Sequence, residues 1–501
     1  MDISAYSILA HVFSVNSLIA MFVGIVGGII IGALPGLSAN MGVALLVPVT
    51  FTMDTSSGLL MLVSLYTSAI YGGSITAILL HTPGTSASAA TAIDGYELTK
   101  QGKAGLALRI STYCSVIGGV VSGIALLVLT PPLSKVALLF GPSDYFLLAV
   151  FGLTMIAGVA SDSLLKGLIA GAFGLLLATF GVDLDTGFPR FTFGITGLIS
   201  GVSFVPAMIG LFSLSQVMIM AETAREQRIL ETRKVEDWRW VPTLAEMKKI
   251  WTTIVRSSII GVLIGILPGA GGDIASWSSY NEAKRFSKNK KEFGKGAIEG
   301  VAASETANNA VTGGSLIPLL TLGIPGSSTA AVLLGALMIK GLMPGRELFT
   351  KYADVTYTVM VGFLFANIFM GVVGMIVARY ATNITKIPNR VLGPLVVALC
   401  VIGSFSIGNS IFDVWVMLAF GLLGYVMRKY GYHPAPVVLG LILGPMAEKG
   451  FRQAVVLSHG NLAGYYFSSP ISVILIILIT GGVLSPFIAK LFRRKRITET
   501  Q

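Results

Sequence analysis

Long runs without a charged residue dominate the chain and predict membrane-spanning helices. Uncharged stretches cover 110–134, 191–221, 355–378 and 460–489. Each is longer than the ~20 residues that cross the hydrocarbon core of a bilayer. The alternative, a soluble fold whose many helices are buried on every side, is rare. We therefore predict an all-α polytopic membrane protein with roughly ten to twelve membrane segments.

Composition supports this prediction and excludes a nucleic-acid-binding protein. The 501 residues are 54% hydrophobic and 12% charged, whereas a soluble domain has about a quarter charged residues. The net charge is +11, but the basic residues gather in short connecting loops, as the positive-inside rule describes. The first 17 residues contain no Lys or Arg, so we interpret Leu18–Leu34 as a retained membrane segment rather than a cleaved signal. Cys114 and Cys400 lie in apolar segments, where a packing role is expected.

The chain divides into two similar halves. A polar stretch at 222–253 separates a first membrane repeat, 1–221, from a second, 254–490, and a basic tail follows at 491–501. IGALPGLSAN at 31–40 matches IGILPGAGGD at 264–273, and YGGSITAILLHTPGTSAS at 71–88 matches TGGSLIPLLTLGIPGSST at 312–329. Two-fold internal repeats are a recurrent plan of secondary transporters.

The basic loops bear on the orientation of these repeats. Loops at 225–256, 284–295 and 491–496 are all predicted to be cytoplasmic. A simple inverted pair of odd-numbered halves would not place all three loops on that side. Re-entrant segments would resolve this conflict, and we expect inverted rather than parallel repeats.

Each half interrupts a long uncharged run with a Pro-Gly pair. The pairs are Pro83-Gly84 in the run 55–93 and Pro325-Gly326 in the run 306–339. Backbone groups freed by such a break are tolerated in a membrane only inside protein or beside a water-filled cavity. A helix that begins after the break directs its N–H groups at the gap, flanked by the hydroxyls of Thr85, Ser86, Ser327 and Ser328. This pattern predicts a carboxylate site, and kinks with Ser/Thr caps are the alternative.

Two further matched pairs add polar side chains. The Leu-Pro-Gly breaks, Pro35-Gly36 and Pro268-Gly269, precede Ser38, Asn40 and Asp273, and the Gly-Gly-Ser segments supply Ser74 and Ser315. Asp273 is also consistent with a residue that faces the loop. Oxygen-bearing side chains on an apolar helix are candidates for a Na⁺ site or, at the carboxylate, a proton site: Glu305, Asn308, Asn309 and Thr312. Hydrogen bonding between helices explains the same residues equally well.

Enzyme and channel functions were weighed against transport. The four histidines, His11, His81, His433 and His459, have no metal-ligand spacing, and the chain has no Walker A motif and no nucleophile elbow. We expect neither an enzyme nor a cofactor. An anion channel, or a carrier without a binding-protein partner, stays as the alternative, because broken helices also build filters.

These motifs resemble those of a known transporter family. IGALPGLSAN, YGGSITAILLHTPGTSASAATAIDGYELTKQGKAG and ASETANNAVTGGSLIPLLTLGIPGSSTAAVLLGALMIKGLMPG are similar to the large membrane subunit of the tripartite tricarboxylate transporters. The resemblance implies a multi-pass protein of the bacterial inner membrane. It also implies two partners, a small integral membrane subunit and a periplasmic solute-binding protein that captures citrate or another organic carboxylate. Uptake would be driven by an ion gradient, with Na⁺ and H⁺ both open.

Overall fold

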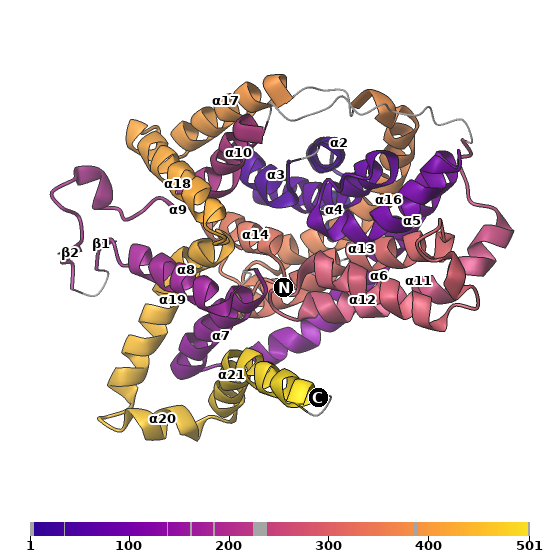
Figure 1. Cartoon of the computed structure of the whole chain (residues 1–501). Helices are drawn as coiled ribbons and strands as arrows, with labels where there is room; N and C mark the ends of the chain where they lie inside the picture. Colours follow the sequence, from indigo (N-terminus) through magenta and orange to yellow (C-terminus); the bar gives the residue numbers. More distant parts are fainter. Residues whose placement is uncertain are drawn as a thin grey trace.

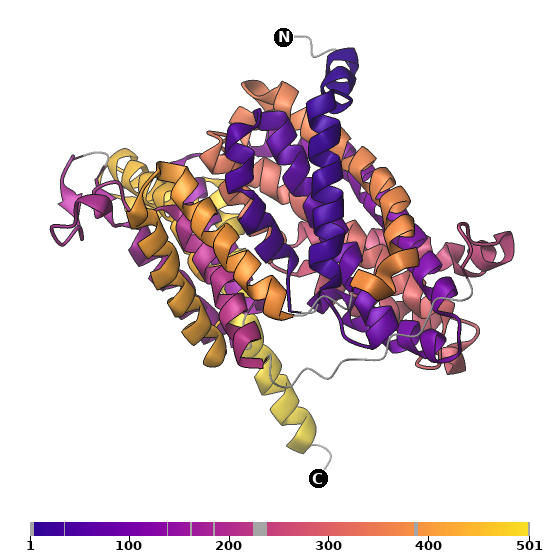
Figure 2. The same ribbon diagram turned by 90° about the horizontal axis from the view of Figure 1, so that it is seen from above.

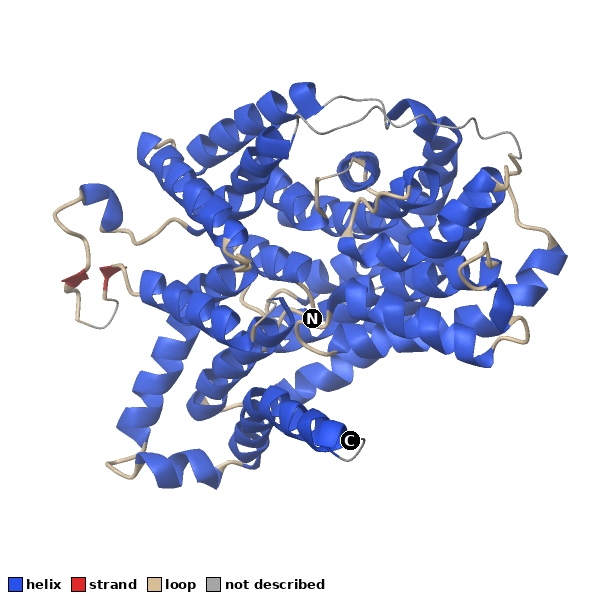
Figure 3. Cartoon of the chain, in the orientation of Figure 1, coloured by secondary structure: helices blue, strands red, loops and turns tan. Residues whose placement is uncertain are grey.

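The computed structural model describes residues 5–34, 36–137, 139–160, 163–183, 186–223, 238–384 and 389–498 (Figure 1). Within these ranges nearly all regular structure is helical (Figure 3). The strands there are two short segments, β1 (Gly181–Val182) and β2 (Pro189–Arg190), which pair antiparallel with Gly181 opposite Arg190. The predicted helical fold class is confirmed.

The helices before the polar linker are α1 (Ala5–Val12), α2 (Val15–Ala33), α3 (Ala39–Leu46), α4 (Thr55–Leu80), α5 (Ala89–Lys100), α6 (Ala104–Ala137), α7 (Pro142–Ala160), α8 (Leu164–Ala178), α9 (Phe204–Met208) and α10 (Ser215–Thr223). Short turns of 3-10 helix occur at η1 (Pro48–Thr52), η2 (Ser86–Ser88) and η3 (Thr196–Leu198), and η4 (Ile209–Leu214) is a π-helical turn that joins α9 to α10.

The helices after the linker are α11 (Leu244–Ile266), α12 (Gly271–Phe286), α13 (Ile298–Leu322), α14 (Ser328–Ile339), α15 (Arg346–Thr350), α16 (Ala353–Ile384), α17 (Asn389–Gly408), α18 (Ile411–Lys429), α19 (Ala435–Leu457), α20 (Leu462–Ser468) and α21 (Pro470–Thr498), with the 3-10 turn η5 (Lys290–Glu292). Residues 224–237 of the polar linker and residues 499–501 of the basic tail lie outside the described residues.

Seven of the described helices are long and apolar enough to cross a membrane, or eight if the bent pair α20–α21 forms one span. This number is smaller than the ten to twelve segments expected from the sequence. Two of the segments counted there are short apolar helices, at Leu164–Ala178 and Leu392–Gly408. Two pieces that the sequence already indicated to be too short to span, at Ala39–Thr52 and Ser328–Ile339, are short helices as well. A helix rises 1.5 Å per residue, so the 12 residues of α14 reach about 18 Å, well short of a ~30 Å core.

The Pro-Gly pairs lie between helices. α4 ends at Leu80 and α13 at Leu322, and helical geometry returns at Ser86 and Ser328 respectively. Glycine is required at both pairs by close backbone approach: a Cβ on Gly84 would lie 2.0 Å from the Gly32 carbonyl oxygen, and one on Gly326 would lie 2.1 Å from that of Gly265.

The Leu-Pro-Gly segments also separate helices, α2 from α3 and α11 from α12. Gly36 and Gly269 adopt positive φ angles of 90° and 76°, a region that glycine enters without steric cost. Pro35 lies outside the described residues, whereas Pro268 precedes the turn into α12.

Each Leu-Pro-Gly segment forms a hairpin that starts and ends at one side of the helix bundle. α2 begins beside the start of α4, where the Ser17 and Ser57 hydroxyls are 3.1 Å apart, and α3 leads through η1 back to that point. α11 begins beside η5, where Lys249 Nζ lies 3.2 Å from Glu292 Oε2, and α12 ends just before η5. The basic loops around 249 and 284–295 therefore lie together, as the charge pattern predicted.

The α2–α3 hairpin starts at one end of the helix pair α4 and α13, and the α11–α12 hairpin starts at the other end. α4 and α13 run in opposite directions. Lys340, after α14, donates hydrogen bonds from Nζ to the Thr50 and Met53 carbonyls just before α4 begins. At the other end of α4, Thr99 Oγ1 donates to the Ile78 carbonyl at 2.8 Å. Figure 2 shows α1 and α21 projecting from opposite ends of the molecule.

Asp94 fixes the basic loop to the first half of the chain. Its buried carboxylate accepts hydrogen bonds from the backbone N–H groups of Gly294, Gly296 and Ala297 at 2.8–2.9 Å and from the Tyr280 hydroxyl at 2.8 Å. These hydrogen bonds therefore hold the loop that joins α12 to α13 against α5.

A second group of helices, α7, α8, α18 and α19 with α9–η4–α10, packs beside this core (Figure 1). At one end of it Arg190 of β2 forms an ion pair with Glu448 of α19, with Nη1 and Oε1 2.6 Å apart. Arg452 joins the same cluster by ion pairs to Glu448 and to the largely buried Asp183. These charges hold the β-hairpin loop against α19.

Candidate functional site

The polar side chains predicted from the sequence gather where the two broken helices and the two hairpins meet. α3 packs against α14, and α12 packs against η2 and α5. Each hairpin therefore contacts the break that belongs to the other half of the chain.

After the first break, Ser86 faces α12. Its hydroxyl donates a 2.8 Å hydrogen bond to Asp273 Oδ1, and both side chains are exposed. The neighbouring Thr85 is 8% exposed, and its Oγ1 has no hydrogen-bond partner among the described residues. The first break thus pairs one hydroxyl with a carboxylate of α12, while the Thr85 hydroxyl lies against Gly73 of α4, where a Cβ would be 2.5 Å from its Oγ1.

After the second break, Ser328 faces α3. Asn40 Nδ2 donates to Ser328 Oγ at 3.1 Å, and Thr329 Oγ1 donates to Asn40 Oδ1 at 2.6 Å. Ser38 Oγ and Ser327 Oγ accept from backbone N–H groups of the first turns of α3 and α14, so both helices have a serine N-cap. This break has hydroxyl and amide groups where the first has a carboxylate.

Tyr66 connects the second break to the Gly-Gly-Ser segment of α13. Its hydroxyl lies 2.9 Å from Ser327 Oγ and 3.1 Å from Ser315 Oγ, and all three side chains are buried. Ser315 therefore lies next to the break but contacts it through a tyrosine.

The Glu305 carboxylate lies fully buried among hydroxyl groups of three other helices. Ser74 of α4 and Thr91 of α5 donate to Oε1 at 2.5 Å, and Ser111 and Ser115 of α6 donate to Oε2 at 3.0 and 2.9 Å. Four donors replace much of the hydration that an ionised carboxylate loses on burial. Ser74, predicted to bind substrate, donates its hydroxyl hydrogen to Glu305.

Asn308 is one turn further along α13 and has no such partners. It is 1% exposed, and neither Oδ1 nor Nδ2 has a hydrogen-bond partner among the described residues. Its amide points at the first turn of α12, because a Cβ on Gly272 would lie 2.8 Å from Asn308 Oδ1. A buried amide with both polar atoms unpaired is costly and marks a place for a ligand.

The other two ion-site candidates serve contacts between helices and within a helix. Asn309 Nδ2 lies 3.4 Å from Thr67 Oγ1, which in turn donates to Asn367 Oδ1 of α16 at 2.7 Å. Thr312 Oγ1 donates to the Asn309 carbonyl of its own helix at 2.6 Å.

The sequence interpretation did not include several residues that complete this cluster. Tyr66, Ser111 and Ser115 lie outside the quoted motifs, and Thr91 lies inside one but was not singled out. Only three-dimensional packing brings these four residues to Glu305 and the second break. For Asp273 the sequence left two interpretations open, a polar residue of the second Leu-Pro-Gly motif and a residue that faces the loop. Its signal was present in the repeat, because Asp273 occupies the position that corresponds to Asn40.

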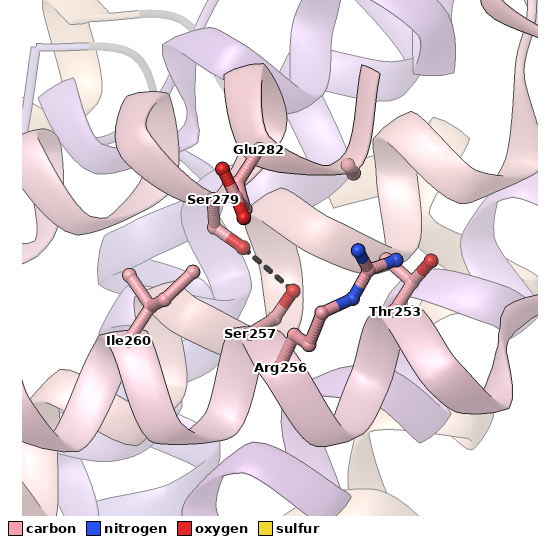
Figure 4. Close-up of a pocket in the computed structure, with 7 residues that line it drawn as sticks. Thr253, Arg256, Ser257, Ile260, Ser279 and Glu282 are labelled. Carbon is pink, nitrogen blue, oxygen red and sulfur yellow. Dashed lines mark hydrogen bonds between the residues drawn. The ribbon is translucent and has the colours of Figure 1, made fainter. Parts of the chain in front are cut away.

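A separate hollow lies between the two arms of the α11–α12 hairpin (Figure 4). It is lined by Thr253, Arg256, Ser257, Ile260, Ser279, Glu282 and Ala283, and the Ser279 hydroxyl donates to Ser257 Oγ at 2.6 Å across it. The two serines tie the arms of the hairpin together. Within the ranges described above, no group of three His, Cys, Asp or Glu side chains gathers to hold a metal ion.

The chain was compared with known proteins. Residues 18–439 match the tripartite tricarboxylate transporter TctA family. A 52.8 kDa protein from Agrobacterium vitis, described as an uncharacterized protein in the TAR-I ttuC' 3' region, is 38% identical over 451 residues, covering 90% of this chain and 89% of that protein. A second A. vitis protein, from the TAR-II ttuC' 3' region, is 40% identical over 212 residues, covering 42% of this chain and 87% of that protein. No solved structure matches the chain.

The family match agrees with the helical architecture and confirms the resemblance seen in the motifs. It covers most of the chain, and it is a match to a transporter family and not to an enzyme family. The protein is a multi-pass protein of the bacterial inner membrane, and its family implies tricarboxylate transport by a tripartite system. The chain belongs to the tripartite tricarboxylate transporter TctA family.

Proposed function

We propose that this protein is an ion-gradient-driven importer of tricarboxylates or related organic carboxylates, and that the substrate binds where the two broken helices meet. The crossed pair of hydrogen bonds carries the proposal: Asn40 to Ser328, and Ser86 to Asp273. It joins each hairpin to the opposite break, so that both halves of the chain build one site. A site shared by two halves suits a carrier that opens to each side in turn.

The two halves, 1–221 and 254–490, are proposed to be inverted structural repeats, with 222–253 as a cytoplasmic linker and 491–501 as a cytoplasmic tail. Three observations support this. α4 and α13 run in opposite directions, the hairpins α2–α3 and α11–α12 start from opposite ends of the bundle, and the paired residues occupy matching positions in the two motifs.

The substrate carboxylates are proposed to meet hydroxyl, amide and backbone N–H groups and not a basic side chain. Ser38, Thr85, Ser86 and Ser327 border the breaks, with Asn40 and Ser328 between them. The N-termini of α3 and α14 add partial positive charge on the same side as these groups. Neutral donors bind more weakly than an arginine would, which suits a substrate that has to be released.

Two partners are proposed from the family, a small integral membrane subunit and a periplasmic solute-binding protein. The second candidate function, an anion channel, is favoured by the polar lining of the breaks alone. The crossed contacts argue against it, because they close the breaks against the hairpins.

Uptake of radiolabelled citrate and other organic acids into proteoliposomes tests the proposal. The permease would be reconstituted with the small subunit and supplied with excess binding protein. Uptake is expected to depend on the binding protein. Under an inward Na⁺ or H⁺ gradient, the carboxylate concentration inside the liposomes should rise above its equilibrium value. A carboxylate flux that is independent of both ion gradients and of the binding protein would establish the channel function instead.

A further inference from the structure

Asn40 and Asp273 occupy matching positions but differ in charge. Each lies in the first turn of the returning helix of its hairpin, α3 or α12, and each pairs with the serine that follows the opposite Pro-Gly break. One is a neutral amide and the other a carboxylate. The two halves of the site therefore favour ligands of opposite charge.

The half built on α12 has the features of a cation site. Asp273 is exposed, and its carboxylate accepts a hydrogen bond from the Ser86 hydroxyl. Among the described residues, no cationic side chain forms an ion pair with it. Asn308 is buried, lacks partners for both polar atoms and points at Gly272, the residue before Asp273. The Thr85 hydroxyl oxygen is also unpartnered among the described residues.

We propose that a monovalent cation of the Na⁺ class binds at this half-site, between the first turn of α12 and η2. Asp273 would supply the charge, and Ser86 and Asn308 would supply neutral oxygens, with Thr85 beside them. Carboxylate, amide and hydroxyl oxygens are the ligands that hard cations prefer. The cation would satisfy the Asn308 carbonyl oxygen, which no group of the described chain does.

The half built on α3 and α14 would then take the substrate carboxylate, a step that rests on the proposed function. Of the residues proposed there to border the substrate, Ser86 would face the cation instead. Asn40, Ser328 and Thr329 are uncharged, and the hydrogen bonds among them leave the Ser328 hydroxyl hydrogen free. The two half-sites adjoin, because the Gly271 N–H donates to the Gly326 carbonyl at 3.3 Å. Cation binding at α12 therefore acts on the break that holds the carboxylate, and each ligand should raise affinity for the other.

Sodium titration of the purified full-length protein tests the cation site without any transport assay. NaCl replaces choline chloride at constant ionic strength, and binding is followed by the unfolding temperature and by tryptophan fluorescence, for which Trp277 lies one turn after Asp273 on α12. Asp273→Asn makes the position match Asn40. Glu282→Gln is the control, since it removes the same charge from the same helix beside the separate hollow of Figure 4.

Wild type and Glu282→Gln are expected to show the same saturable stabilisation by Na⁺. Asp273→Asn should weaken it roughly tenfold to a hundredfold, the loss expected for one charged contact. Asn308→Ala should weaken it as well, and Asn40→Ala should not. Unaltered Na⁺ affinity in a well-folded Asp273→Asn protein would overturn the proposal. So would the absence of a Na⁺ effect in a wild-type protein that still transports carboxylates, and in that case the proposed function would stand.

Discussion

The hydroxyl of Ser328 is the best single test of where the substrate binds. It accepts a hydrogen bond from Asn40, so its own hydrogen is available to a carboxylate oxygen. A hydrogen bond to a charged group contributes about 1.5–3 kcal/mol, so Ser328→Ala should raise the half-saturation concentration for uptake roughly tenfold to a hundredfold. Uptake kinetics with excess binding protein measure this, and Ser468→Ala on α20, whose hydroxyl bonds the Tyr465 carbonyl, is the control. Unchanged kinetics in well-expressed Ser328→Ala would place the carboxylate elsewhere.

Glu305 gives a stability prediction at the same scale. Its carboxylate is the common acceptor for four buried hydroxyls. Glutamine has the same shape and hydroxyls both donate and accept, so Glu305→Gln should fold nearly normally. Glu305→Ala leaves the hydroxyls without their acceptor and should be less stable than Glu305→Gln by about 1–3 kcal/mol. Thermal unfolding of the two variants in the same detergent decides this. Equal stability would show that the hydroxyls find other acceptors.

At the residue scale, the sequence predicted which residue types surround the breaks better than their individual contacts. The repeated Pro-Gly and Leu-Pro-Gly motifs correctly located the residues at the two meeting points, Asn40 with Ser328 among them. Ser74 and Thr312 were assigned to ligands, yet their hydroxyls bond Glu305 and a backbone carbonyl. Spacing along one helix cannot show which neighbouring helix a hydroxyl meets.

Two glycines of α2 offer a matched test of hairpin packing. A Cβ on Gly32 would lie 2.1 Å from the Ala69 carbonyl oxygen of α4, whereas one on Gly27 would have no atom within 4 Å. Gly32→Ala should therefore destabilise the protein by about 1–3 kcal/mol through overpacking. Gly27→Ala should be neutral or stabilise the helix by about 0.5–1 kcal/mol. Unfolding temperatures of both variants check this, and similar effects would contradict close packing of α2 on α4.

The Pro-Gly break itself is tested by Pro325→Ala. Proline prevents α13 from continuing across the break. Alanine supplies the backbone N–H that proline lacks and removes the clash of the proline ring with the preceding turn. If the helix extends across the break, the α14 N-terminus is lost as an anion site, and uptake should fall without loss of surface expression. Retained uptake with unchanged half-saturation would make the break a packing device.

At the scale of elements, the breaks were predictable and the number of spans was not. Proline and glycine act locally, so all four breaks could be located from the sequence. Whether an apolar segment crosses the membrane depends on where it turns back, and α3 and α14 are too short to cross. The hairpin geometry also resolves the apparent conflict among the basic loops, since α12 returns to the side from which α11 started.

For the molecule as a whole, the charge pattern predicts which side faces the cytoplasm. The basic loop before α13 should be cytoplasmic and the loop before α15 periplasmic. Lys291→Cys and Arg346→Cys place single exposed thiols on the two sides, while the native Cys114 and Cys400 are buried. A membrane-impermeant maleimide should label Arg346→Cys in intact cells and Lys291→Cys only after permeabilisation. The reverse pattern would invert the topology.

The charged cluster beside the β-hairpin predicts a pH dependence of stability. The hydrogen bond from Arg190, with the charges of Arg190 and Arg452, holds the pKa of Glu448 below its usual value. Its stabilising effect is therefore fully present above the unfolded-state pKa of about 4.3 and is lost as the pH falls through the lower folded-state pKa. Glu448→Gln should cost about 1 kcal/mol at neutral pH, and the difference from wild type should shrink in acid. Unfolding temperatures across pH measure this, with exposed Glu347→Gln as the control. A difference that grows in acid would contradict it.

The crossed hydrogen bonds also have a consequence for synthesis in the cell. Asn40 and its partner Ser328 are 288 positions apart along the chain. A ribosome that adds about 5–20 residues per second needs roughly a quarter of a minute to a minute to cover that distance. During this time the α2–α3 hairpin is already in the bilayer while its partner helix has not been made. The polar tip of the hairpin therefore depends on water, lipid headgroups or an insertion chaperone until the second half arrives.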